Sequence, residues 1–171
     1  LVLSAVEGVQ AQTRVLMRTI ADMRLPALLF VNKIDRPGAR NAELLAEVRR
    51  TIAPNAISMT RTSDLGGRAA TAVAEHYDDP ALVEALAETD DRVLARVVDG
   101  PPLTAAEVAG ALAAGTAAGR IHPLYAGSAL SGAGISALLE GIVRLLPSAP
   151  VVAAAQPRGT VFAVERTASG E

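Results

Sequence analysis

The chain has 171 residues, half of them hydrophobic, which suits a single domain with a sizeable core. It has no cysteine, so disulfides and thiolate metal sites are excluded, and a reducing, cytoplasmic location is the expectation. Its 16 basic and 18 acidic side chains give a net charge of −2, which argues against DNA binding through bulk charge. No run of about 18 apolar residues occurs, so no membrane partner is expected.

The first third of the chain alternates between predicted strands and helices. Residues 1–3 are predicted to end a buried strand, and residues 27–31 are a continuous apolar run typical of the interior of a parallel sheet. Helices are expected at about 12–23 and 41–52, each followed by a proline. Apolar residues at helical spacing share one face of each helix: Val15, Leu16, Ile20 and Met23 in the first, and Leu44, Leu45, Val48 and Ile52 in the second.

The middle of the chain is predicted to hold two strands followed by helices. Thr104 and Glu107 have the spacing of a capping box, which marks the start of one of these helices. In chain order we expect a strand at 56–62, a turn at 64–67, a returning strand at 68–74, and helices that begin at 80 and at 104. The first helix reaches at least 87, and residues 91–98 either continue it or form a second helix; the last helix ends at about 118.

The last third begins with a short predicted strand at 124–126, followed by a Gly127-Ser128-Ala129 loop. A regular helix is expected after Gly134, with a wide apolar face made of Ile135, Leu138, Leu139, Ile142, Val143 and Leu146. Three prolines within 147–158 predict a linker, and 160–164 is the expected start of a new strand.

Strands that alternate with helices indicate an α/β fold with a mostly parallel sheet. Ligands bind at the carboxyl ends of the strands in such sheets. Two polar loops follow predicted strands at these ends, Asn32-Lys33-Ile34-Asp35 and Gly127-Ser128-Ala129. These loops are therefore the candidate binding site.

Asp35 has the chemistry needed to select guanine. A carboxylate offers two acceptor oxygens in one plane, and guanine presents two parallel donors at N1 and N2. Adenine would face the same carboxylate with a lone pair at N1, so the wrong base meets repulsion as well as a lost contact.

The neighbouring residues have complementary functions in this hypothesis. Asn32 can donate to the base near N7 or tie the loops together. Lys33 is the only lysine among sixteen basic residues, and its slim stem can lie over a flat ring where arginine would not fit. The backbone of Ser128 and Ala129 can direct N–H groups at the guanine O6, while the Ser128 hydroxyl is expected to tie the loop.

The Asn-Lys-x-Asp pattern is specific. With three asparagines and eight aspartates in the chain, it would surround the one lysine by chance about once in a thousand cases. Gly-Ser-Ala alone is a common small-residue turn. Its assignment as a binding loop is supported because it follows the Asn-Lys-x-Asp motif in the chain and because it comes directly after a predicted strand.

These motifs resemble the base-binding loops of translation-factor GTPases. The stretch from Leu25 to Arg36 is similar to the elongation factor G branch, and Glu88 to Arg96 resembles an inserted subdomain of that branch. The stretches Gln12 to Leu16 and Ile121 to Ala129 look most like the ribosomal protection proteins that confer tetracycline resistance.

The resemblance implies the C-terminal part of a Ras-like P-loop GTPase domain with a small inserted subdomain, plus the first strand of a β-barrel domain. It places a partial GTPase domain at 1–150, the insert at about 56–120, a linker at 151–158 and the start of the barrel at 159–171. The implied site residues are Asn32, Lys33, Asp35, Ser128 and Ala129, and the implied ligands are GTP and GDP.

The implied function is part of a ribosome-dependent GTPase that protects ribosomes from tetracycline. An elongation factor G-type translocase and a vestigial, non-enzymatic GTPase-like module are the alternatives. The ribosome is the implied partner, reached through the full-length protein.

A phosphate-binding loop needs a Gly-x4-Gly-Lys-Ser/Thr motif, and the one lysine is already at position 33. The chain is therefore expected to be a fragment that reads the base but does not hydrolyse GTP alone. No catalytic residue and no metal ligand is assigned to it, and Mg²⁺ is expected only in the full-length protein.

Overall fold

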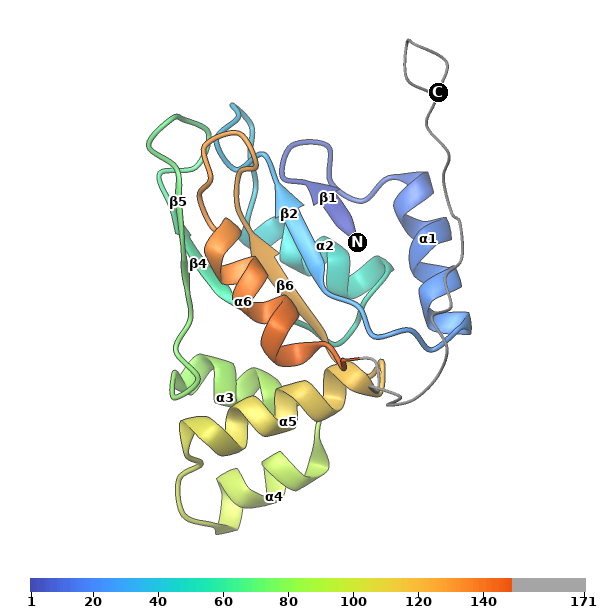
Figure 1. Ribbon diagram of the computed structural model, residues 1–171, viewed down its shortest axis with the longest axis vertical. Helices are drawn as coiled ribbons and strands as arrows, with labels where there is room; N and C mark the ends of the chain where they lie inside the picture. Colours follow the sequence, from blue (N-terminus) through green and yellow to red (C-terminus); the bar gives the residue numbers. More distant parts are fainter. Residues whose placement is uncertain (149–171) are drawn as a thin grey trace, which may run out of the picture.

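The computed structural model describes residues 1–148. Its centre is a four-stranded parallel sheet in the order β1-β2-β6-β3 (Figure 1). The strands are β1 (Val2–Ser4), β2 (Leu29–Asn32), β3 (Ala56–Ser58) and β6 (His122–Ala126). The expected α/β fold with a mostly parallel sheet is confirmed.

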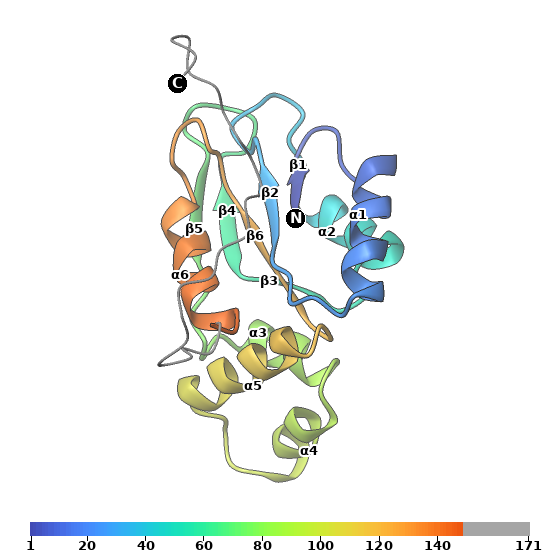
Figure 2. The same ribbon diagram turned by 45° about the vertical axis from the view of Figure 1, so that its right-hand side comes forward.

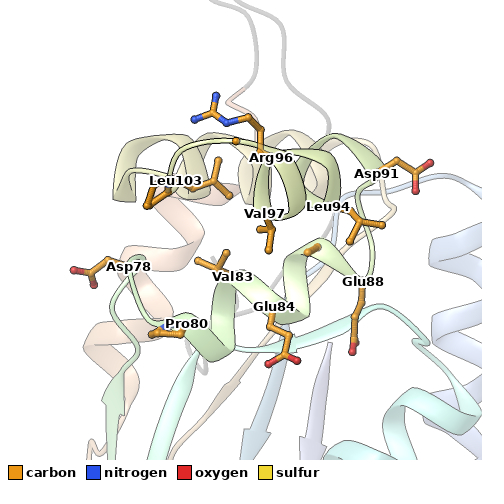
Figure 3. Close-up of a pocket in the computed structure, with 13 residues that line it drawn as sticks. Asp78, Pro80, Val83, Glu84, Glu88, Asp91, Leu94, Arg96, Val97 and Leu103 are labelled. Carbon is orange, nitrogen blue, oxygen red and sulfur yellow. The ribbon is translucent and has the colours of Figure 1, made fainter.

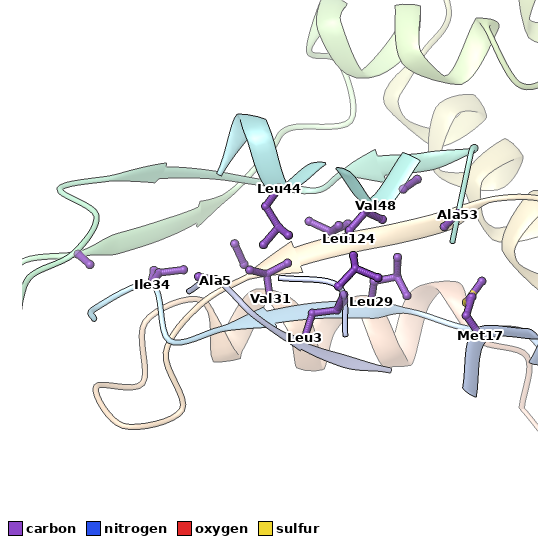
Figure 4. Packing of buried hydrophobic residues seen from close by; sticks show 14 residues of the cluster. Leu3, Ala5, Met17, Leu29, Val31, Ile34, Leu44, Val48, Ala53 and Leu124 are labelled. Carbon is purple, nitrogen blue, oxygen red and sulfur yellow. The ribbon is translucent and has the colours of Figure 1, made fainter. Parts of the chain in front are cut away.

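Helices cover both faces of this sheet. Helices α1 (Ala11–Asp22) and α2 (Ala42–Thr51) cover one face, and α6 (Ile135–Leu145) covers the other (Figure 1). Strand β2 shows why the run at 27–31 is continuously apolar. Leu29 and Val31 pack into the core beneath α2, which Figure 4 shows, while Phe30 packs into the core on the α6 side. Both faces of the strand are buried, so both must be apolar.

The residues between β3 and β6 form a hairpin and a helical group. Strands β4 (Thr60–Ser63) and β5 (Thr71–Ala74) pair antiparallel in a second sheet. Helices α3 (Pro80–Ala87), α4 (Asp91–Asp99) and α5 (Ala105–Ala117) lie together at one end of the molecule (Figures 1 and 2). The capping box expected at the start of α5 is present, with the Thr104 and Glu107 side chains bonded reciprocally to the backbone.

The expected strand at 56–62 is wrong, because the segment divides between two sheets at Met59. Strand β3 pairs with β6, and the Met59 N–H then donates to the Leu124 carbonyl at 2.8 Å. One residue later the Thr60 hydroxyl, and not its backbone, accepts from the Ala126 N–H at 2.8 Å. The side chain ends the ladder and releases the backbone to pair with β5.

The apolar face expected for the first helix is wrong in part. Helix α1 turns Thr13 and Met17 into the core and leaves Val15 and Met23 60% and 62% exposed. The apolar residues of this helix cover a broad arc, and spacing alone does not say which part of the arc meets the sheet. In α2 the expected face is confirmed, with Leu44 and Val48 fully buried.

The wide apolar face expected for the last helix is also only partly buried. Ile135, Leu138 and Leu146 are partly buried, whereas Leu139 and Val143 are 57% and 81% exposed. The fully buried residues are Gly141 and Leu145, and neither belongs to the expected face. The contact is centred on Gly141, where an added Cβ would strike the Tyr125 hydroxyl. The helix approaches the sheet where it has no side chain, and this rotates Leu139 and Val143 outward.

The predicted linker at 151–158, and the barrel strand within 159–171, lie outside the described residues. Within residues 1–148, no helix combines the length and the apolar character needed to cross a bilayer.

Candidate nucleotide-base site

The two loops singled out from the sequence lie side by side at the carboxyl edge of the sheet. Strands β2 and β6 are neighbours, with Val31 opposite Ala126. The Gly127 N–H donates to the Val31 carbonyl at 2.9 Å, and the Gly127 carbonyl accepts from the Ile34 N–H at 3.2 Å. These hydrogen bonds join the loops directly, so side chains of both loops share one site.

Asn32 ties the loops together through its side chain. Its Oδ1 atom accepts from the Lys33 N–H at 2.8 Å and from the Ala129 N–H at 3.0 Å. The side-chain amino group is then the part of Asn32 left to donate, and a ring nitrogen such as guanine N7 is a suitable acceptor.

Asp35 lies beside the second loop. Its side chain is 12% exposed, and Arg36 is 3.8 Å away. Hydrogen bonding from the Ser128 hydroxyl is the main cause that lowers the pKa of the Asp35 carboxyl, and partial burial opposes it. The carboxylate is therefore charged at neutral pH, which is the form that accepts two donors from a base edge.

The Ser128 and Ala129 N–H groups have protein acceptors in this structure, which differs from the expectation that both point at a base carbonyl. The Ser128 N–H donates to the Ala133 carbonyl at 2.9 Å, and the Ala129 N–H donates to Asn32 Oδ1. A base O6 atom would reach the Ala129 N–H only by sharing it with Asn32. The Ser128 hydroxyl accepts from the Ser131 N–H at 3.2 Å and so ties the loop, as expected.

Two glycines allow the second loop to close tightly. At Gly127 a Cβ would strike the Ala133 carbonyl and the Phe30 ring. Gly134 has a φ of +74°, and a Cβ there would strike the Ala126 carbonyl. Any side chain at either position would force the loop to shift from this conformation.

The β4–β5 hairpin supports both loops from behind. The Gly66 N–H donates to the Ile34 carbonyl at 2.8 Å, and the Thr62 hydroxyl accepts from Asn41 Nδ2 at 2.7 Å. The Thr60 hydroxyl accepts from the Ala126 N–H, just before Gly127. No sequence pattern indicates this support, because it depends on where the hairpin packs.

Lys33 adopts a left-handed backbone conformation, with a φ of +71°. Its Nζ atom lies 3.1 Å from Oε1 of Glu7, which is in the loop after β1. Sequence reasoning missed Glu7. The sequence did hold a signal for it, because Glu7 follows the predicted strand at 1–3, and loops at the carboxyl ends of parallel strands line the binding site.

One cavity adjoins the candidate base site, and a larger one lies away from it. One of about 390 Å³ lies beside Lys33 and is lined by Ser4, Glu7, Gly8 and Asn32 among others. A larger one of about 840 Å³ lies between α3 and α4, and Figure 3 shows the apolar Val83, Leu94, Val97 and Leu103 around it. The larger cavity shares no residue with the two loops. Within residues 1–148 no group of three metal-ligating side chains gathers.

Comparison with known proteins agrees with this geometry. Residues 1–148 match the family described as the elongation factor Tu GTP-binding domain. The chain is 51% identical to tetracycline resistance protein TetM of Streptomyces lividans and 48% identical to an oxytetracycline resistance protein of Streptomyces rimosus. These alignments cover the whole of this chain but only 28% and 27% of the relatives.

A solved structure of a protein from Thermus thermophilus has the same fold. It superimposes with a TM-score of 0.70 at 23% identity, over 85% of this chain and 26% of that one. The family match extends over the whole described sheet and over both loops at its carboxyl edge. The chain therefore belongs to the elongation factor Tu GTP-binding domain family.

Proposed function

We propose that this chain is the guanine-reading part of a ribosome-dependent GTPase that protects ribosomes from tetracycline. Asn32, Lys33, Asp35, Ser128 and Ala129 form the base site. One observation carries the proposal: the loop that holds Asp35 and the 127–129 turn lie at the same edge of the sheet, joined by the Ile34 N–H, which donates to the Gly127 carbonyl at 3.2 Å.

Each residue has a distinct task in the proposed site. The Asp35 carboxylate accepts from the N1 and N2 donors of guanine, and the Asn32 amino group donates to N7. The Lys33 stem covers one face of the ring. The Ala129 N–H, shared with Asn32, donates to O6, an acceptor that adenine lacks.

The protective function belongs to the intact protein in this proposal. It is supported by the names of the relatives, which are resistance proteins for tetracycline and oxytetracycline. GTP and GDP are the ligands, and GTP hydrolysis, Mg²⁺ binding and ribosome contact take place in the cytoplasm in the full-length protein. The 171-residue chain alone reads the base without hydrolysing GTP.

The proposed organisation follows the same comparison. The GTPase domain covers 1–150, with an inserted subdomain at about 56–120, and a barrel domain begins at 159 after a linker at 151–158. The separate hairpin and the helices α3–α5 at one end of the molecule support an insert in this region.

Asp35→Asn in the intact protein tests the base assignment. We expect GTP affinity to fall at least about a hundredfold, because a charged bidentate acceptor is lost. Affinity for xanthosine triphosphate should rise, because its C2 oxygen accepts from the new amide. Calorimetric titration with both nucleotides measures this. Unchanged GTP affinity contradicts the proposal.

Expression of the intact protein in a tetracycline-sensitive host tests the biological function. We expect the unmodified protein to raise tetracycline tolerance and the Asp35→Asn protein to fail to do so. Faster ribosomal translocation without protection would identify a translocase instead. Absence of any nucleotide binding would identify a vestigial module.

A further inference from the structure

The loop between β1 and α1 is held in one conformation by hydrogen bonds to the side chain and the backbone of Ser4. The Ser4 hydroxyl oxygen accepts from the Val6 and Glu7 N–H groups, both at 3.3 Å. The Gly8 N–H donates to the Ser4 carbonyl at 2.9 Å, and Gly8 has a φ of +72°. Glu7 therefore projects from a closed turn.

This turn is also fastened to its surroundings at three points. The Ala5 N–H donates to the Asn32 carbonyl at 2.8 Å, and the Ala5 carbonyl accepts from the Arg40 N–H at 3.0 Å. The Glu47 carboxylate accepts from the Val9 N–H at 3.2 Å and from the Arg40 guanidinium at 3.1 Å. The base of the turn is thus fixed relative to the Asn32 loop.

From this turn the Glu7 carboxylate reaches the Lys33 ammonium at 3.1 Å. The two side chains are 42% and 47% exposed, so the pair contributes little to folding stability. The same contact lowers the pKa of Glu7, which keeps the carboxylate charged at neutral pH. Lys33 itself lies in a strained left-handed conformation, of the kind that gathers at functional sites.

We propose that Glu7 is a positioning residue for guanine-nucleotide binding, acting by holding the Lys33 ammonium so that the stem is already extended over the base position. The inference rests on the proposed function. A lysine side chain loses much rotamer freedom when it is ordered. If the Lys33 side chain is already ordered before the nucleotide arrives, less of this entropy cost is left to weaken binding.

A double-mutant cycle on the intact protein tests this proposal with GDP as the probe. We expect Glu7→Gln to weaken GDP binding about three- to tenfold, because Lys33 is released. In a Lys33→Met background the same change should have no effect, since there is no ammonium to hold. Glu43→Gln is the matched control. It removes an exposed carboxylate on α2 and should leave GDP affinity unchanged.

Further arms separate the remaining explanations. Glu7→Asp keeps the charge and should recover at least part of the lost affinity, which decides the matter if Lys33→Met binds too weakly to measure. If Glu7 merely repels phosphates, Glu7→Gln will tighten GTP binding more than guanosine binding, and this result overturns the proposal. An equal loss in both lysine backgrounds also overturns it. Failure of the proposed function is distinguishable, because the unmodified protein would then bind no GDP or Asp35→Asn would have no effect.

Discussion

Asp35 and Ser128 form the pair on which the chemistry of the site depends. They are far apart in the sequence, and their loops are joined by backbone hydrogen bonds because β2 and β6 are neighbours. The Ser128 hydroxyl is the main cause that lowers the pKa of the Asp35 carboxyl, and it thereby favours the charged form. In the proposed base site, Ser128 therefore acts through Asp35.

Ser128→Ala should make nucleotide binding more sensitive to acid. The hydroxyl lowers the pKa of Asp35, so the carboxylate of the unmodified protein stays charged as the pH falls through its ordinary range. Without the hydroxyl that pKa rises, and the carboxylate becomes protonated at a higher pH. GDP affinity measured against pH should show its acidic loss shifted upward.

Ser131→Ala is the matched control for this experiment. Ser131 is exposed in the same loop, and its hydroxyl accepts only a long bond from the Ala133 N–H at 3.4 Å. Its acidic midpoint should equal that of the unmodified protein. Coincident midpoints for all three proteins would refute the role of Ser128.

At the level of elements, the β4–β5 hairpin supports the site through Thr60. This residue is 2% exposed, and its hydroxyl is the acceptor for the Ala126 N–H at the end of β6. At the end of β6 the Ala126 N–H therefore bonds to a side chain of the hairpin instead of to the backbone of a neighbouring strand. This bond connects the region at 60–74 to the loop that begins at Gly127.

Thr60→Val should reduce the free energy of unfolding by about 1–3 kcal/mol, because a buried N–H loses its acceptor while the side-chain shape is kept. Chemical denaturation measures this. Thr71→Val is the control. Thr71 lies on β5 of the same hairpin and is exposed, and its side-chain hydroxyl bonds only to the Ser63 hydroxyl. A Thr60 variant that is no less stable than the Thr71 variant would show that the bond contributes nothing.

At the scale of the whole molecule, His122 makes the fold sensitive to acid. It lies at the start of β6, it is 8% exposed, and its Nδ1 atom has no partner among the described residues. Burial lowers the pKa of His122, and the nearby Ala27 backbone opposes this only in part. The folded protein therefore holds the neutral imidazole.

The sign of the pH effect follows from this lowered pKa. Between the folded pKa and the unfolded value of about 6.5, the unfolded chain binds more protons, so stability falls as the pH falls. We expect His122→Gln to flatten the decline of the thermal midpoint below about pH 6.5. His76→Gln, at an exposed position, should leave the decline unchanged. Parallel curves for the His122 variant and the unmodified protein would contradict the prediction.

The sequence by itself determined the parallel α/β layer and the edge of the sheet at which the loops of the proposed base site lie. The run at 27–31 is apolar on both faces, which specifies an interior strand. The strands of a parallel sheet have their carboxyl ends at a common edge. Those two facts predict that the loops at 32–35 and 127–129 lie at the same edge, and the pairing of β2 with β6 in the structure joins them. Local patterns also determined the start of α5, because a capping box acts within one turn.

Only the tertiary structure decided which residues of each pattern are buried and which additional groups reach the site. Helical spacing defines an apolar arc, but the close approach at Gly141 decided which part of α6 is buried. The division at Met59 and the support from Thr60 depend on the partner strand β6. The Glu7–Lys33 contact joins residues from two loops, and such a distance is settled only when neighbouring strands pack.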